Sequence, residues 1–236
     1  MVVIYDFDGT LTPYSLPQYE LLEKCGYDEE KLMNRIKKEL NNNKELYSVY
    51  YKCYMEILAE NKIPMTKENI CLGAKNVQFN NGVLEYFKSF QTSNTDIKHF
   101  IVTSGIQAYV DETHIRKFVD GVYGVTFNEE NGIYKDIDIL LTDKKKVDVI
   151  KQVQKDNNET NNIIYFGDGL TDSFAFEYVH SIGGKNVFIA TKNESMETYK
   201  QLNVKGIIDK CFEPDFSMDS ELSKYIQTQI EEEKCK

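Results

Sequence analysis

The chain begins Met1-Val2-Val3-Ile4-Tyr5-Asp6-Phe7-Asp8-Gly9-Thr10, an apolar run that ends abruptly in two carboxylates and a glycine. Similar short, almost wholly apolar runs recur at residues 100–103, 163–166 and 187–190, and a weaker one at 206–208. Uninterrupted apolar runs of this length suit strands that are buried on both faces, as in a parallel sheet. The opening stretch therefore predicts the first strand of such a sheet.

Helix-compatible stretches separate these runs, at residues 82–90, 107–118, 145–155 and 173–179. Strands that alternate with helices are typical of an α/β fold with a doubly wound, mainly parallel sheet. Residues 125–127 and 133–134 flank the turn-forming segment 128–132 and predict a β-hairpin. No chemistry is assigned to that hairpin.

Residues 14–77 interrupt the alternation. Segments 18–24, 29–41, 44–61 and 67–74 look helical and are joined by polar or proline-containing turns. We predict a core of residues 1–13 and 78–236, with residues 14–77 inserted as an α-helical domain. Within the third helix, the three-and-four spacing of an apolar stripe predicts core packing for Leu46, Val49, Tyr50, Cys53, Tyr54, Ile57 and Leu58.

Size and charge narrow the class of protein. The 236 residues include 41% apolar residues, enough to build a core, and the formal net charge is −10, from 28 Lys and Arg against 38 Asp and Glu. That charge repels nucleic acid. The apolar runs are too short for a membrane span or a signal peptide, and the five cysteines include no CxxC pair. We expect a cytoplasmic protein with reduced thiols, no membrane and no nucleic-acid partner; its oligomeric state is not predicted.

Asp6 and Asp8 follow the first predicted strand, at the edge where open α/β sheets bind ligands. A carboxylate that attacks phosphorus forms a labile acyl phosphate and splits ester hydrolysis into two easier steps. Asp6 is the predicted nucleophile, and Asp8, two residues on, is the predicted general acid and base. The alternative is a simple polar turn with Asp8-Gly9 at its bend.

Ser104-Gly105 lies between a predicted strand and a predicted helix, where a hydroxyl and free amides suit a phosphate group. The alternative role for Ser104 is that of a helix N-cap. Lys144-Lys145-Lys146 opens another helix; a fixed ammonium would stabilise a transferring phosphoryl group, whereas a charge run is otherwise a solvated face. Lys146 is favoured over Lys145 because the core-facing stripe of that helix continues from it. Thr10 is included among the expected phosphate-binding residues.

The segment 167–172, Gly-Asp-Gly-Leu-Thr-Asp, adds two carboxylates after the run 163–166. Magnesium prefers oxygen ligands in octahedral geometry and keeps waters and substrate oxygens. Asp6, the backbone carbonyl of Asp8, and Asp168 are the predicted Mg²⁺ ligands, with Asp172 holding the ligands or their waters.

Taken together and in this order, the DFDGT segment, Ser104, Lys146 and the GDGLTD segment resemble the four motifs of the haloacid-dehalogenase (HAD) superfamily. The resemblance covers residues 1–13 and 78–190 and implies a Rossmann-like sheet, magnesium and an aspartyl-phosphate intermediate. A helical insertion between the first two motifs is similar to the phosphoserine-phosphatase-like branch, in which it forms a cap over the substrate. The pattern departs from that branch at Ser15, where a glutamate is expected, at Ile106 in place of a glycine, and at Thr171 in place of an asparagine.

These observations predict a magnesium-dependent phosphatase acting on a small phosphorylated metabolite. A phosphomutase or phosphotransferase would use similar residues but pass the phosphoryl group to a second hydroxyl instead of water. A non-catalytic phosphate-binding module is the alternative from another class; such a module would be expected to have lost Asp6, Asp8 or the acidic metal pair.

Overall fold

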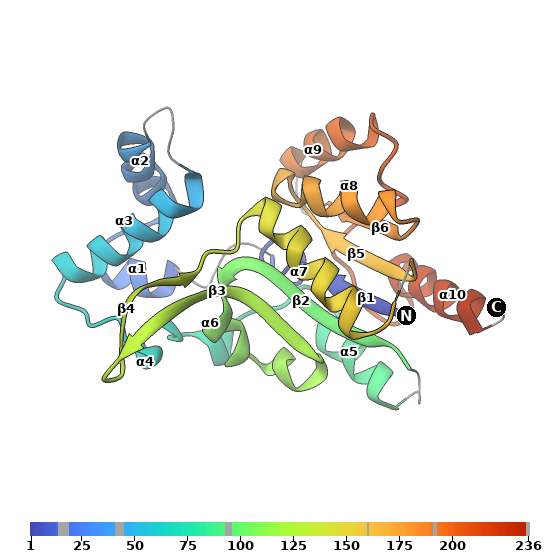
Figure 1. Cartoon of the computed structure of the whole chain (residues 1–236), viewed down its shortest axis with the longest axis horizontal. Coiled ribbons are helices and arrows are strands. Elements are labelled where there is room, and N and C mark those ends of the chain that lie inside the picture. Colours follow the sequence, from blue (N-terminus) through green and yellow to red (C-terminus); the bar gives the residue numbers. More distant parts are fainter. Residues whose placement is uncertain (14–18, 41–44, 93–95, 160, 191–192, 235–236) are drawn as a thin grey trace.

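The computed structural model describes residues 1–13, 19–40, 45–92, 96–159, 161–190 and 193–234. Its strands and helices alternate as predicted, and Figure 1 shows one twisted sheet with helices packed against it. The strands are β1 (Val2–Tyr5), β2 (Lys98–Ile106), β3 (Gly121–Glu130), β4 (Ile133–Ile139), β5 (Ile163–Gly167), β6 (Lys185–Ile189) and β7 (Lys210–Phe212). The α-helices are α1 (Tyr19–Lys24), α2 (Glu29–Glu39), α3 (Leu46–Glu60), α4 (Lys67–Ile70), α5 (Val83–Thr92), α6 (Gln107–Asp111), α7 (Asp143–Asp156), α8 (Ser173–Ser181), α9 (Asn193–Asn203) and α10 (Glu221–Lys234). Short 3₁₀ helices lie at Ala74–Asn76, His114–Phe118 and Leu170–Asp172.

The sheet has the strand order β4-β3-β2-β1-β5-β6-β7. All neighbouring strands run parallel except the edge strand β4, which pairs antiparallel with β3 as the predicted hairpin. The opening strand β1 lies near the middle and pairs with β2 on one side and β5 on the other. The prediction of a doubly wound, mainly parallel sheet is therefore confirmed.

The two faces of the sheet bury two separate apolar cores, because side chains alternate along each strand. In β1, Val2 and Ile4 join the core beneath α7 and α8, whereas Val3 and Tyr5 join the core beneath α5 and α10. All four residues are at most 1% exposed. Burial on both faces explains why the run lacks a polar residue.

The predictions fail toward the C-terminal end. The apolar run 206–208 is not a strand: Gly206, with a left-handed φ of 66°, closes the turn after α9, and Ile207 packs into the core. The seventh strand starts later, at Lys210, where pairing with β6 becomes possible. The predicted helix 107–118 is instead α6 followed by a separate 3₁₀ turn. Helices α9 and α10 were not predicted.

Helices α1 to α4 lie between β1 and α5 in the sequence and form a group beside the sheet, next to the β3–β4 hairpin (Figure 1). The hairpin supports them: the Tyr134 amide donates to the Met65 carbonyl at 2.7 Å, and the rings of Tyr51 and Phe127 pack 6.0 Å apart. The division into a core and an inserted cap domain remains our prediction.

The predicted stripe of α3 is only partly core. Val49, Cys53, Tyr54, Ile57 and Leu58 are buried as predicted, but Leu46 is 44% exposed and Tyr50 is half-buried. Both belong to the first turns of α3, at the end of the helix that faces the strand ends.

No helix of the described residues is long and apolar enough to cross a lipid bilayer.

Candidate active site

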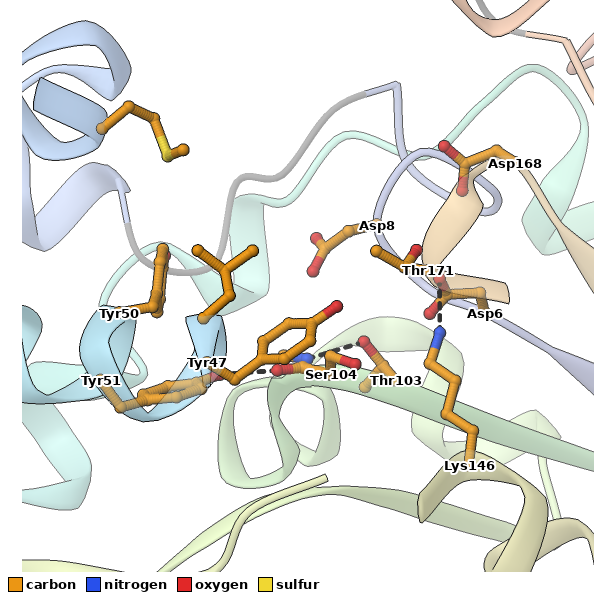
Figure 2. A pocket seen from close by; sticks show the side chains of 13 residues that line it. Asp6, Asp8, Tyr47, Tyr50, Tyr51, Thr103, Ser104, Lys146, Asp168 and Thr171 are labelled. Carbon is orange, nitrogen blue, oxygen red and sulfur yellow. Dashed lines mark hydrogen bonds and ion pairs between the residues drawn. The ribbon is translucent and has the colours of Figure 1, made fainter. Parts of the chain in front are cut away.

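The carboxyl ends of β1, β2 and β5 meet at one edge of the sheet because these strands are neighbours and run parallel. The sequence-predicted residues Asp6, Ser104 and Asp168 follow or end these strands, and all three line one cavity of about 340 Å³. Figure 2 shows this cavity between the strand ends and α3. Its lining consists of Asp6, Asp8, Met33, Leu46, Tyr47, Tyr50, Tyr51, Thr103, Ser104, Gly105, Lys146, Asp168 and Thr171.

Asp6 is held by a donor on each carboxylate oxygen. The Phe7 amide donates to Oδ1 at 2.8 Å, and the Lys146 ammonium lies 2.9 Å from Oδ2. Burial, together with the nearby Asp172 carboxylate, raises the pKa of Asp6 to about 7, although Lys146 and the Phe7 amide oppose that shift. The carboxylate therefore has a fixed orientation, and burial makes its ionised form less stable than that of an exposed aspartate.

Lys146 is the lysine that faces the site, as the sequence favoured. Its side chain is fully buried, and its ammonium contacts Asp172 Oδ1 at 2.8 Å as well as Asp6. Lys145, one residue earlier, is exposed. The difference follows from helix geometry, because Lys146 shares the core-facing side of α7 with Ile150 and Val153.

Asp172 has hydrogen-bond donors on both oxygens. Oδ1 accepts from the Lys146 ammonium and from the Tyr165 hydroxyl at 2.7 Å; Oδ2 accepts from the amides of Asp168 and Gly169 at 3.2 and 3.3 Å. The carboxylate thus anchors both the lysine and the loop that carries Asp168. Sequence reasoning missed Tyr165, whose only signal is a hydroxyl within an otherwise apolar strand.

Three carboxylates converge at this edge. One oxygen from each of Asp6, Asp168 and Asp172 lies within 4.8 Å of the others. Lys146 supplies one positive charge against three negative ones. Burial and the neighbouring carboxylates of Asp172 and Asp6 accordingly raise the pKa of Asp168 well above its usual value. An excess of negative charge on hard oxygen atoms fits a divalent cation such as Mg²⁺.

Gly9 makes room for this cluster. It has a left-handed φ of 78°, and a β-carbon at this position would lie 2.1 Å from Asp168 Oδ2. The Thr10 hydroxyl donates to Asp168 Oδ1 at 3.0 Å. Thr10, expected to bind phosphate, is fully buried and is not among the cavity-lining residues. Its observed contact is therefore with a predicted metal ligand.

Ser104 lies in an irregular part of β2, where the register with β3 shifts between Val102 and Ile106. The Gly105 amide donates to the Thr103 hydroxyl at 2.9 Å, which tightens this bend and turns it toward the cavity. Ser104 is not the N-cap of α6: that position is Ile106, and no side chain caps the helix. The N-cap alternative is therefore wrong.

Asp8 extends into the cavity from the loop after β1, on the side that faces α3 (Figure 2). It lies across from Tyr47, which belongs to α3. The two predicted catalytic carboxylates thus occupy different parts of the cavity: Asp6 is beside Lys146, and Asp8 is toward the helices of residues 19–76.

Neither a protein-family model nor a curated protein sequence matches this chain. Solved structures match over most of its length. A phosphoserine phosphatase in its apo form has a TM-score of 0.67 at 16% identity, over 96% of this chain and 97% of that chain. A phospho-aspartyl intermediate analogue of phosphoserine phosphatase has a TM-score of 0.66 at 18% identity, with the same coverage. The chain has the fold of the HAD-type phosphoserine phosphatases. A HAD family hydrolase from Salmonella enterica serovar Typhi is also similar, with a TM-score of 0.67 at 16% identity over 93% of this chain and 72% of that chain.

The structure places two of the three positions at which the sequence departs from the expected pattern. Thr171 lines the cavity, and Ile106 is fully buried at the start of α6. Ser15, where the resemblance expects a glutamate, lies outside the described residues.

Proposed function

We propose that the protein is a magnesium-dependent phosphatase that hydrolyses a small phosphomonoester through an aspartyl phosphate on Asp6. One observation carries the proposal: Asp6 faces a cavity with the Lys146 ammonium 2.9 Å from its Oδ2 and two further carboxylates beside it. A carboxylate nucleophile, a fixed cation and an acidic cluster for Mg²⁺ are what phosphoryl transfer to an aspartate requires.

The reaction has two steps. In the first, a carboxylate oxygen of Asp6 bonds to phosphorus while the bond from phosphorus to the ester oxygen breaks, and Asp8 gives its proton to the departing alkoxide. In the second, water attacks phosphorus and loses a proton to Asp8, which restores its acid form. Inorganic phosphate leaves, and the Asp6 carboxylate is regenerated.

Several residues support these steps through charge and position. The Lys146 ammonium stabilises the negative oxygens of the phosphoryl group during transfer. Ser104 and Gly105 line the cavity from β2 and would hold the phosphate from that strand. Asp172 keeps both Lys146 and the Asp168 loop in position through its four hydrogen bonds.

Asp6, Asp168 and the backbone carbonyl of Asp8 would hold the Mg²⁺ ion, with Asp172 behind them. The ion, when bound, supplies the positive charge that offsets the repulsion between the Asp6 carboxylate and the phosphate dianion. Burial first, and then the neighbouring carboxylates, raise the pKa values of Asp6 and Asp168.

The proposal is tested with purified protein and p-nitrophenyl phosphate. We expect hydrolysis that requires Mg²⁺, stops when the metal is chelated, and is lost in Asp6→Asn, because a carboxamide is a poor nucleophile for phosphorus. Asp148→Asn is the matched control: Asp148 is exposed on α7, outside the cavity lining, and this variant should keep full activity. Full activity in Asp6→Asn would refute the nucleophile assignment.

A further inference from the structure

The cavity has two chemically different walls. The wall at the strand ends is polar and charged, and in the proposed function it binds the phosphate group. The opposite wall comes from α2 and α3 and contains Met33, Leu46, Tyr47, Tyr50 and Tyr51. None of these five side chains is charged. This apolar and aromatic wall, called here the tyrosine wall, faces the part of the substrate that leaves with the ester oxygen.

Hydrogen bonds and ring packing fix the tyrosine wall. The buried Tyr51 donates its hydroxyl to the Ser104 carbonyl at 2.7 Å. The Tyr50 ring packs edge-on against the Tyr51 ring, with centroids 5.1 Å apart and planes at 75°. The Tyr47 hydroxyl donates to Asp143 Oδ1 at 2.6 Å. Two of the three rings are therefore anchored to the core, so the wall is formed before a substrate binds.

The tyrosine wall is also neutral at physiological pH. Burial, and then the hydrogen bond to Asp143, raise the pKa of Tyr47 above its ordinary value, so its hydroxyl stays protonated. Polar atoms of this wall are engaged with the core: the hydroxyls of Tyr47 and Tyr51 already donate to an acceptor. What Tyr50, Met33 and Leu46 offer a substrate is mainly ring and hydrocarbon surface.

Such a wall disfavours an amino-acid ester. The carboxylate and ammonium of a phosphoamino acid each need an opposite charge or several hydrogen bonds, and burying them without partners is costly. Among the described residues that line the cavity, the charged ones are Asp6, Asp8, Lys146 and Asp168. Three of them lie at the strand ends, and Asp8 extends from the loop after β1 toward α3, so the cation among them, Lys146, is on the phosphate side. Within the described part of the chain, the tyrosine wall offers no cation to a substrate carboxylate.

We propose that the substrate is the phosphomonoester of a neutral alcohol with an aromatic body, whose ring packs against Tyr50 and Tyr47 while its phosphate meets Asp6 and Lys146. This inference rests on the proposed phosphatase function and adds the class of the leaving group. Aromatic rings pack favourably edge-to-face or offset, and Met33 supplies a polarizable thioether for the same surface. The cavity of about 340 Å³ is at the small end of ligand sites, which suits a single ring.

The test compares three esters whose leaving groups are all alkoxides, so that their intrinsic reactivities are similar: benzyl phosphate, ethyl phosphate and phosphoserine. We expect kcat/KM for benzyl phosphate to exceed the other two values by about tenfold, mainly through a lower KM, as expected for aromatic packing plus apolar burial. Tyr50→Ala should reduce the ratio of benzyl to ethyl phosphate by about fivefold, and Tyr50→Phe should retain it.

Tyr225→Ala is the matched control, because Tyr225 is a half-buried tyrosine on α10 that is not part of the cavity. It should leave the ratio unchanged. Phosphoserine or ethyl phosphate hydrolysed as efficiently as benzyl phosphate would overturn the aromatic leaving group but leave the phosphatase function intact. An unchanged ratio in Tyr50→Ala would do the same. No hydrolysis of any of the three esters would overturn the aromatic leaving group, and no hydrolysis of p-nitrophenyl phosphate either would overturn both proposals.

Discussion

Lys146 is a fully buried cation that lies between two carboxylates, those of Asp6 and Asp172. Burial alone would lower its pKa, but Asp172 and Asp6 hold that pKa well above the usual value. We predict that Lys146→Met loses at least ~100-fold in kcat, as expected when transition-state charge stabilisation is removed. The same variant should lose about 3–5 kcal/mol in the free energy of unfolding, because two buried carboxylates lose their partner.

The matched control for Lys146→Met is Lys145→Met. Lys145 is exposed, and only its backbone amide takes part in the helix cap, by donating to the Thr142 hydroxyl. Its replacement should change the free energy of unfolding by no more than about 0.5 kcal/mol. Urea denaturation and p-nitrophenyl phosphate hydrolysis measure both effects. An inactive Lys145→Met beside an active Lys146→Met would reverse the assignment.

Tyr165 acts on the site through Asp172, since its hydroxyl donates to the same oxygen that Lys146 contacts. Burial and the Asp172 carboxylate raise its pKa, so it remains a proton donor. We predict that Tyr165→Phe costs about 1–3 kcal/mol of stability and lowers kcat several-fold with little change in KM. Tyr178→Phe, which removes a part-buried tyrosine hydrogen bond to Gln154 outside the site, should lose some stability and keep its kcat. Equal kcat values in the two variants would restrict Tyr165 to a structural role.

At the scale of an element, the turn after β1 determines whether Asp6 and Asp168 can sit together. Gly9→Ala would place a β-carbon 2.1 Å from Asp168 Oδ2, in addition to the penalty for a left-handed φ. Gly132, in the β3–β4 turn, has the same φ of 78°, but no atom lies within 4 Å of the added carbon. Both variants should therefore lose about 1–2 kcal/mol of stability from the backbone.

Only Gly9→Ala should also displace Asp168. We expect it to weaken Mg²⁺ binding at least ~10-fold, the cost typical of disturbing the support of a metal site. Titration calorimetry with Mg²⁺ measures this difference, and Gly132→Ala should bind as the wild type does. Equal affinities would show that the turn tolerates the added methyl group and that Gly9 is needed for its backbone conformation alone.

The sequence predicted best what depends on strand ends. Buried parallel strands are recognisable by their apolar runs, and their carboxyl ends must meet at one edge, which is why Asp6, Ser104 and Asp168 were found together. Helix periodicity identified Lys146 because this residue continues the buried stripe of α7. These features depend on local patterns and on topology.

The sequence predicted poorly what depends on how elements dock. Tyr50 and Leu46 follow the same stripe as Cys53, but the stripe leaves the core where α3 reaches the cavity, and spacing alone does not show where that happens. Helix α10 carried a readable signal in the spacing of Leu222, Ile226 and Ile230, all of which are buried. β7 was misplaced because the apolar Ile207 packs beneath the sheet rather than within it.

On the scale of the whole molecule, burial shifts the pKa values of the site carboxylates and of His99 in opposite directions. The site edge gathers carboxylates whose pKa values are raised, so acidification adds protons to the folded protein there. His99 is buried on the sheet face that carries Tyr5, and its Nδ1 lies 3.1 Å from the tyrosine hydroxyl. Burial lowers the pKa of His99 to about 4, so acidification adds protons to this residue first in the unfolded chain.

This opposition predicts a measurable acid sensitivity from His99. Between its ordinary pKa of 6.5 and its folded value of about 4, the unfolded state binds the proton and the folded state does not. The contribution of His99 to stability is therefore complete above pH 6.5 and decreases as the pH falls through that window. From pH 7 to pH 5 the loss amounts to about 2 kcal/mol.

In His99→Phe this loss should disappear, so wild type should lose about 2 kcal/mol more than the variant over that range, measured by urea denaturation at both pH values. The carboxylates are common to both proteins and cancel in the comparison. His180→Gln, at an exposed position on α8, should keep the wild-type pH dependence. If His99→Phe lost as much stability as wild type between pH 7 and pH 5, the acid sensitivity would have to arise elsewhere in the chain, and the buried imidazole would be charged in the folded protein.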